Sequence, residues 1–212
     1  MKPIRIVKIV LDIVMYLLCM VLMGQHLASG AIHEYLGAGL FVCFIAHNAL
    51  NYKWYKALFK GKYTALRIVQ TAVNFLLMIS FIACMLSALM ISGVIFRDIR
   101  IPNMMMLGRQ LHMVSTAWCF VLMSVHLGMH IKAPKQKVPK ICFYITMLTA
   151  SAVGVYHFII RRFYEELFLL TEFKWFDYDK TFIGYLFETI CISLAFVMLT
   201  YFIKTLLRRR KK

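Results

Sequence analysis

Residues 108–131 read GRQLHMVSTAWCFVLMSVHLGMHI, and residues 32–51 read IHEYLGAGLFVCFIAHNALN. Each stretch is apolar enough to cross about 30 Å of hydrocarbon as a helix, and each carries two histidines at the same spacing of 14 residues. The pairs are His112 with His126, and His33 with His47. This spacing is close to four helical turns, so each pair lies on one helix face, about 21 Å apart along the axis.

The whole chain has the composition of a membrane protein. Of its 212 residues, 62% are hydrophobic and 16% are charged, whereas soluble domains carry about 45–50% apolar and about 25% charged residues. This difference excludes a water-soluble globule, a disordered chain and a secreted disulfide scaffold. The six cysteines all fall within apolar stretches and form no CxxC pair, so we expect them to pack as small apolar side chains.

Six apolar stretches predict an all-α, polytopic membrane helix bundle of about six transmembrane helices. They cover approximately residues 6–25, 32–51, 66–92, 108–131, 141–161 and 182–203. Residues 1–131 would form a four-helix core. Residues 132–212 would add two transmembrane helices, an outer loop at 161–181 and a basic cytoplasmic tail. That loop is expected either to continue the fifth span or to lie in the membrane interface, with Trp175 and Tyr178 as anchors.

Basic residues predict which end of the bundle is cytoplasmic. The N-terminus, the 51–67 loop, the 132–140 loop and the C-terminal tail together hold 18 basic residues and no acidic one. The opposite end holds 7 basic and 7 acidic residues. By the positive-inside rule, both termini face the cytoplasm. The cationic tail is interpreted as a membrane anchor rather than a nucleic-acid-binding segment.

The histidine pairs predict the cofactor. The second and fourth spans both run from outside to inside, so His33 can face His112 and His47 can face His126. Two imidazoles that face each other across a helix bundle form a low-spin haem site, with one nitrogen on each axial position of the iron. Two such pairs imply two haem b groups, with a haem-binding core between the second and fourth helices. The alternative is four unrelated polar residues that share a spacing, at high cost in lipid.

Three other histidines leave part of this assignment open. His130 lies one turn beyond His126 on the same face. The matched spacing favours His126 as the inner ligand, while His130 remains an alternative. His26 and His157 lie near the outer ends of their spans. We expect each to be an interfacial hydrogen-bonding group, or to line a quinone or proton path.

Basic side chains near the predicted haems are candidates for binding the anionic propionates. Arg109 lies one turn outside His112, at the outer end of its span. The other candidates are Arg97 and Arg100 on the outer side, and Lys53 and Arg67 on the inner side. Ordinary snorkelling of these cations to the membrane surface is the competing explanation.

Small and acidic residues within the spans have two explanations each. Gly37 and Gly39 lie between His33 and His47, where a missing side chain would admit a flat macrocycle or allow close helix packing. Asp12 lies in the first span near the depth of His47. Its carboxylate could exchange protons with a quinone or bridge two helices.

Two groups of motifs carry a family resemblance. The first is Gly30-Ala-Ile-His33-Glu34-Tyr-Leu-Gly37, followed by His47-Asn48-x-x-Asn51-x-x-Trp54 and Lys56-Ala-Leu-Phe-Lys-Gly-Lys-Tyr63. The second is Arg109-x-x-His112-x-x-Ser115-x-x-Trp118, followed by Phe120-Val-Leu-Met-Ser-x-His126-Leu-Gly128-Met-His130. These motifs resemble the bacterial flavinylation-associated cytochrome family over residues 5–131, and more loosely over 141–212. The family pattern contains both His126 and His130, so it leaves the inner ligand open.

The resemblance implies a b-type cytochrome of the bacterial cytoplasmic membrane that works with an extracytoplasmic, covalently flavinylated (FMN-carrying) electron carrier. We therefore expect an electron-transfer subunit rather than a stand-alone enzyme, one that carries electrons between a quinol or cytoplasmic-side donor and an outer acceptor. A quinone is a further candidate cofactor. Two other classes fit the sequence: a transporter of metal ions or protons that uses the intramembrane His, Asp12 and Glu188, and a non-catalytic membrane anchor of a redox complex.

Overall fold

The computed structural model describes residues 3–24, 30–99, 102–172 and 179–209. Its long helices are α1 (Pro3–Leu22), α2 (Gly30–Leu50), α4 (Ala65–Ile91), α5 (Met105–His130), α6 (Lys137–Ile160) and α8 (Phe182–Arg209). The connections contain short helices α3 (Tyr52–Ala57) and α7 (Phe163–Phe168) and the 3-10 turns η2 (Arg97–Ile99) and η3 (Pro102–Met104). The six long helices coincide with the six predicted apolar stretches, and α8 runs past its predicted end at residue 203.

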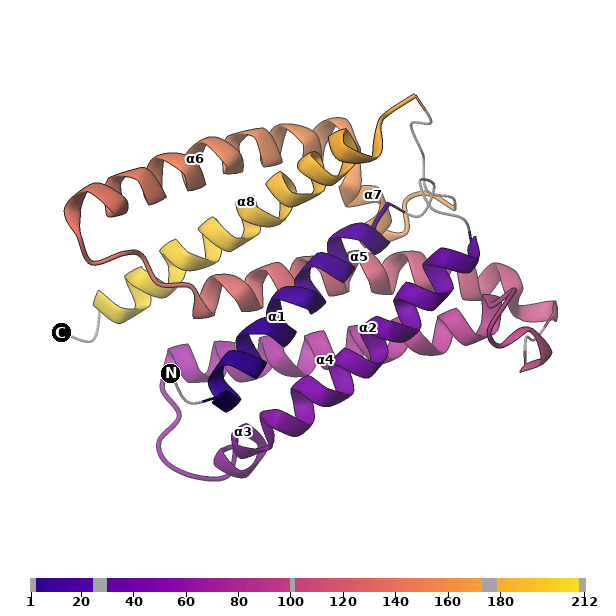
Figure 1. Ribbon diagram of the computed structural model, residues 1–212, viewed down its shortest axis with the longest axis horizontal. Helices are drawn as coiled ribbons and strands as arrows, with labels where there is room; N and C mark the ends of the chain where they lie inside the picture. The colour runs from indigo at the N-terminus through magenta and orange to yellow at the C-terminus, as the bar shows by residue number, and fades with distance from the viewer. Residues whose placement is uncertain (1–2, 25–29, 100–101, 173–178, 210–212) are drawn as a thin grey trace.

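The protein is an all-α, multi-pass membrane helix bundle, as the composition predicts. Five of the described helices are long and apolar enough to cross a membrane, namely α2, α4, α5, α6 and α8. Helix α1 has 20 residues and lies beside them (Figure 1). It differs from the other five because Arg5, Lys8 and Asp12 interrupt its apolar sequence.

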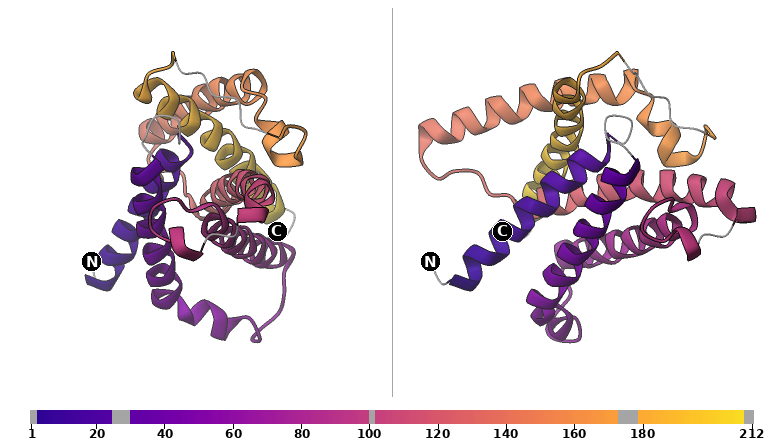
Figure 2. Two further views of the ribbon diagram at one scale, coloured as in Figure 1. Left: turned by 90° about the vertical axis from the view of Figure 1, so that its right-hand side faces the viewer. Right: turned by 45° about the vertical axis from the view of Figure 1, so that its right-hand side comes forward.

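Helix α5 is the centre of the bundle (Figures 1 and 2). Helix α4 packs along it as an antiparallel hairpin, α8 packs against another side, and α7 also contacts it. Helices α6 and α8 form a second pair, and α1 and α2 form a third. This position explains why α5 has ten buried residues, whereas the only residue of α2 that is buried is Leu40.

The last two spans share their core with the first four. One buried cluster joins Met20 of α1, Phe120 of α5, Phe163 of α7 and Ile192 of α8. Polar contacts reinforce it, because Ser193 Oγ lies 2.8 Å from Ser124 Oγ and accepts a hydrogen bond from the Tyr16 hydroxyl at 3.3 Å. Residues 132–212 are therefore packed into the same bundle as residues 1–131.

The outer segment after α6 does not continue the fifth span. Helix α6 ends at Ile160, and the chain turns at Arg162, whose φ of 51° is in the left-handed region. Helix α7 then packs inward, where Trp118 Nε1 donates to the Leu167 carbonyl oxygen at 2.9 Å. Of the two predicted alternatives, the continued helix is wrong. Trp175 and Tyr178, the predicted interfacial anchors, lie outside the described residues.

The basic connections gather at one end of the bundle, which we call the basic end. Figure 1 shows there the start of α1, the short helix α3, the start of α4, the end of α5, the start of α6 and the end of α8. Its described basic residues are Arg5, Lys8, Lys53, Lys56, Lys60, Lys62, Arg67, Lys132, Lys135, Lys137, Lys140, Lys204 and Arg208. The helices therefore alternate in direction as the charge pattern requires.

Close backbone contact between α6 and α8 yields a first prediction. A Cβ added at Gly154 would overlap the Cys191 backbone, whereas one added at Gly39 meets no atom within 4 Å. We expect Gly154→Ala to lower the free energy of unfolding by about 1–3 kcal/mol, because overpacking forces the two helices apart. The matched control is Gly39→Ala. Thermal unfolding in detergent micelles measures both, and equal midpoints would contradict this account.

Candidate functional site

The predicted ligands lie on two helices that run in the same direction. His33 and His47 belong to α2, and His112 and His126 belong to α5 (Figure 1). All four side chains are half-buried. This parallel arrangement is the one that the matched spacing requires, because it pairs the two outer histidines at one depth and the two inner histidines at another.

At the outer depth, the rings of His33 and His112 are brought together. Their centres are 6.2 Å apart, and their planes are inclined by 74°. Two imidazoles that bind one iron from opposite sides have ring centres about 6 Å apart, since each metal–nitrogen bond is about 2 Å long. The rings form a T-shaped contact, for which this separation is also usual. The outer pair therefore has a separation that would suit two axial ligands as well as a direct ring contact.

Helix α4 orients the ring of His112. Its Nδ1 lies 3.2 Å from the Cys84 carbonyl oxygen and 3.3 Å from Ser87 Oγ. Because a carbonyl oxygen only accepts, Nδ1 carries the proton and donates to it. A neutral imidazole in this tautomer has its lone pair on Nε2. Histidines that bind metals commonly donate their other ring N–H in this way, which fixes the tautomer and the ring orientation.

At the inner depth, two more imidazoles have oxygen acceptors on neighbouring helices. His47 Nδ1 lies 2.8 Å from Asp12 Oδ1 of α1, and His126 Nδ1 lies 2.8 Å from Asn74 Oδ1 of α4. Both oxygens accept, so each ring donates its Nδ1–H. His47 also lies close enough to His126 to interact electrostatically with its ring. Residues of four helices therefore converge at this depth.

His130 differs from His126 in its surroundings. It is the last residue of α5 and is exposed, and its ring centre lies 4.7 Å from that of His126. Lys204 interacts with it electrostatically. At this depth the Asn74 side chain binds the ring of His126. The choice of His126 over His130 as the inner ligand stays a prediction, which the matched spacing favours.

The two glycines of α2 are not explained by helix packing. A Cβ added at Gly37 or at Gly39 meets no atom within 4 Å. At Gly128, by contrast, an added Cβ would lie 2.6 Å from the Val197 carbonyl oxygen of α8. Gly37 is half-buried and Gly39 is exposed. The space beside Gly37 fits the first of the two predicted explanations, a flat ligand against the backbone of α2.

The basic residues that could bind haem propionates differ in whether other contacts already hold their side chains. Arg109, Arg97 and Lys53 are exposed, as expected for side chains that reach a membrane surface, and Arg100 lies outside the described residues. Arg67 instead holds the α3–α4 connection together. Its guanidinium donates to the Ala57 carbonyl oxygen at 2.6 Å and lies 4.1 Å from the centre of the Tyr63 ring.

The remaining predicted residues have other partners. His157 Nδ1 lies 3.4 Å from Glu188 Oε1, and Lys180 Nζ lies 2.7 Å from the same oxygen. These contacts tie α6 to α8 and the segment before it. His157 is thus in polar contact with Glu188 near the end of its helix, and its two predicted roles stay predictions. His26 lies outside the described residues.

Sequence reasoning missed the α4 residues that hold the outer pair. Cys84 acts through its backbone oxygen, which no residue pattern reveals, and Ser87 adds a hydroxyl. Glu34 was also missed, although it follows His33. Its carboxylate accepts hydrogen bonds from Ser92 Oγ and from the backbone N–H groups of residues 93–95. This contact fixes the outer end of α2 against the chain that follows α4.

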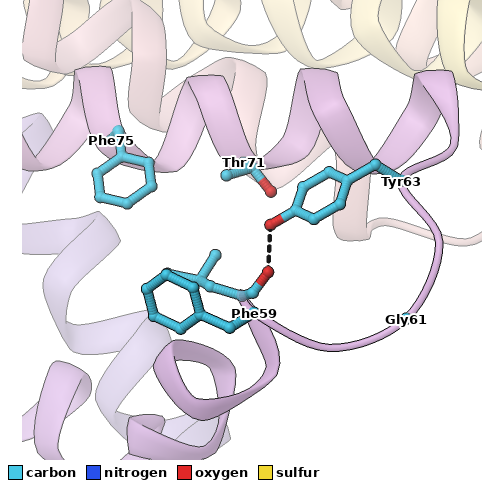
Figure 3. Close-up of a pocket in the computed structure, with 6 residues that line it drawn as sticks. Phe59, Gly61, Tyr63, Thr71 and Phe75 are labelled. Carbon is cyan, nitrogen blue, oxygen red and sulfur yellow. Dashed lines mark hydrogen bonds between the residues drawn. The ribbon is translucent and has the colours of Figure 1, made fainter.

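An apolar pocket of about 410 Å³ lies at the basic end, between the α3–α4 connection and α4 (Figure 3). Its lining residues are Leu58, Phe59, Gly61, Tyr63, Thr71 and Phe75. The Tyr63 hydroxyl donates to the Leu58 carbonyl oxygen at 2.5 Å, and this bond closes one wall (Figure 3). Phe75 directly follows Asn74, the partner of His126.

Within the described part of the chain, no three His, Cys, Asp or Glu side chains come together as a metal site. A bis-histidine haem does not need such a cluster, since the porphyrin supplies the other four nitrogens. Comparisons with family models, with curated proteins and with solved structures each found no match to this chain.

The space beside Gly37 yields a second prediction. We expect Gly37→Leu to reduce bound haem to about half or less, because the new side chain occupies the position of a macrocycle. Gly39→Leu on the same helix is the control, since it makes the same change in helix propensity at an exposed position. Haem per protein, measured by absorbance, distinguishes them. Equal haem content in both variants would contradict this interpretation of Gly37.

Proposed function

We propose that this protein is a membrane b-type cytochrome that carries electrons across the bilayer through two bis-histidine haems. His33 and His112 would bind the outer haem, and His47 and His126 the inner one. One observation carries the proposal: three of these imidazoles, at two depths, each donate Nδ1–H to an oxygen of a neighbouring helix. This is the arrangement that orients histidine for metal binding through Nε2.

A purely structural role accounts poorly for these histidines. A structural polar residue in a membrane helix needs one hydrogen-bond partner, and the Nδ1 contacts already provide it. They do not explain the half-buried Gly37, beside which there is space. The T-shaped contact of the His33 and His112 rings also has a separation that would suit two axial ligands. A haem between α2 and α5 accounts for both features.

The chain's own residues would bind, orient and insulate the two haems. Cys84, Asn74 and Asp12 hold the imidazoles in one tautomer, and exposed Arg109 is suited to an outer propionate. The apolar side chains of the bundle keep water away from the ligand atoms. When bound, haem supplies reversible one-electron chemistry, and its potential depends on the axial ligands, burial and nearby charge.

We assign the basic end to the cytoplasm by the positive-inside rule, so both termini would be cytoplasmic. The membrane would then be the bacterial cytoplasmic membrane. The acceptor at the outer end would be the flavinylated extracytoplasmic carrier that the family resemblance implies. The protein would thus be an electron-transfer subunit of an oxidoreductase system.

We further propose that a quinol donates electrons at the pocket between the α3–α4 connection and α4. Its walls are largely apolar and aromatic, as a quinol ring requires (Figure 3). It lies at the basic end, where a quinol would enter from the membrane surface. Phe75, which lines this pocket, directly follows Asn74 in α4, and Asn74 binds His126. Helix α4 therefore supplies both a wall of the pocket and a partner of an inner histidine.

The haem assignment yields a third prediction. Pyridine haemochrome analysis of the purified protein should give about two haem b per chain. His126→Ala should retain about one haem, because it removes an axial ligand, whereas His130→Ala should retain both. A colourless protein from haem-replete cells would contradict the proposal, and metal-dependent uptake into vesicles would then favour a transporter. Loss of haem in His130→Ala alone would make His130 the inner ligand.

The quinol pocket yields a fourth prediction. Thr71→Trp fills the pocket, so the rate of haem reduction by a short-chain quinol should fall about tenfold. Thr149→Trp is the matched control, because Thr149 is exposed on α6, away from the pocket. Both variants should contain wild-type amounts of dithionite-reducible haem. Unchanged quinol kinetics in Thr71→Trp would move the donor site elsewhere.

A further inference from the structure

The two histidine pairs differ in the charge of the groups that accept their Nδ1–H. The outer ligand His112 donates to a backbone carbonyl, and the inner ligand His126 donates to an amide oxygen. Both acceptors are neutral. His47 alone among these three donates to a carboxylate, with 2.8 Å between its Nδ1 and Asp12 Oδ1. The inner pair therefore includes a carboxylate–histidine unit.

We propose that Asp12 makes the inner haem the lower-potential member of the pair, so that electrons run downhill from the basic end to the outer end. This inference rests on the proposed function, since it concerns haems bound at the two histidine pairs. Asp12 is a positioning residue, because it touches His47 and not the iron.

The physical reason is electron donation through the imidazole. A carboxylate that accepts the Nδ1–H draws the proton toward itself and leaves more electron density on Nε2, which makes His47 a stronger ligand. A stronger donor and a nearby negative charge both stabilise ferric over ferrous iron, which lowers the reduction potential. The low dielectric of the membrane strengthens the effect of the charge.

The placement of Asp12 agrees with this role. Its side chain is 54% exposed on α1. Where this helix lies in the bilayer, that is a costly position for an acid without a specific partner. Its neighbour Lys8, one turn away, donates instead to Asn51 Oδ1 at 2.8 Å. The contact with His47 is therefore what holds this carboxylate in place.

Two other charged groups near the histidine pairs, Lys204 and Glu34, are engaged in separate contacts. At the inner end, Lys204 Nζ donates to the carbonyl oxygens of Gly128, Met129 and Ile131, which partly offset its charge. At the outer end, the Glu34 carboxylate accepts four hydrogen bonds from residues 92–95. Those donors stabilise the Glu34 charge locally, so we expect it to influence the outer iron less than Asp12 influences the inner one.

Haems at the two pairs would supply one-electron chemistry. The inner haem, held by His47 and His126, would give up one electron to the outer haem, held by His33 and His112, with no proton passed between them. Two such steps would oxidise one quinol at the basic end to a quinone and release two protons there, and the order of potentials would favour electron flow outward. The histidine arrangement alone is symmetric and would favour neither direction.

Redox titration tests this inference on the full-length haem-loaded protein. The inner haem is followed in His112→Ala, and the outer haem in His126→Ala, so each midpoint is assigned separately. In Asp12→Asn, the ratio of reduced to oxidised inner haem at fixed potential should rise about tenfold, a shift of about 59 mV for one electron. The outer midpoint should not move. Glu34→Gln is the control for loss of a carboxylate at the outer end, and should leave the inner midpoint unchanged.

A second variant covers the case in which Asp12→Asn fails to bind the inner haem. Asn74→Asp puts a carboxylate against His126, and should lower the inner midpoint by a similar amount. The inference is overturned if the inner midpoint lies above the outer one, or if neither variant moves it in the stated direction. Either result, obtained with two haems bound, would leave the proposed cytochrome function intact. An absence of haem would instead overturn that function.

Discussion

An imidazole inside a membrane needs an acceptor for its ring N–H, because lipid offers none. In this bundle, oxygen atoms of neighbouring helices accept these N–H groups: a backbone carbonyl and an amide on α4, and a carboxylate on α1. The hydrogen bonds therefore constrain where α1 and α4 lie relative to the histidines. The hydrogen bonds also leave each ring in the tautomer that can bind a metal through Nε2.

Helix α5 carries two of these histidines and is also the helix against which most of the bundle packs. On one side, small and hydroxyl residues such as Ser124 and Gly128 allow α8 to approach closely. On the other, His112 and His126 are only half-buried, and α2 packs mainly against α1. The bundle is thus tight where α5 meets α4 and α8, and looser toward α2. This asymmetry is what a helix bundle needs in order to admit a flat cofactor at one face while remaining folded.

Much of the fold follows from the sequence because lipid imposes strict rules. Long apolar stretches must be helices, and basic residues mark one end, so the helix bounds and their alternation were predictable. The depth of Asp12 near His47 was also predictable. Other features were not, because they depend on three-dimensional contact. A backbone carbonyl such as that of Cys84 has no sequence signal, and the turn at Arg162 is made by a residue type that rarely adopts positive φ.

The contacts of the Lys204 ammonium group bear on the order in which the bundle folds during synthesis. It donates hydrogen bonds to the carbonyl oxygens of Gly128, Met129 and Ile131, at the end of α5 that carries His126. Since the ribosome makes α8 after α5, those carbonyls have no such partner until the last segment has entered the bilayer. The outer histidine pair, held by α2, α4 and α5, does not wait for α8 in this way. Nascent chains should therefore fold in two stages, with the basic end of the bundle completed last.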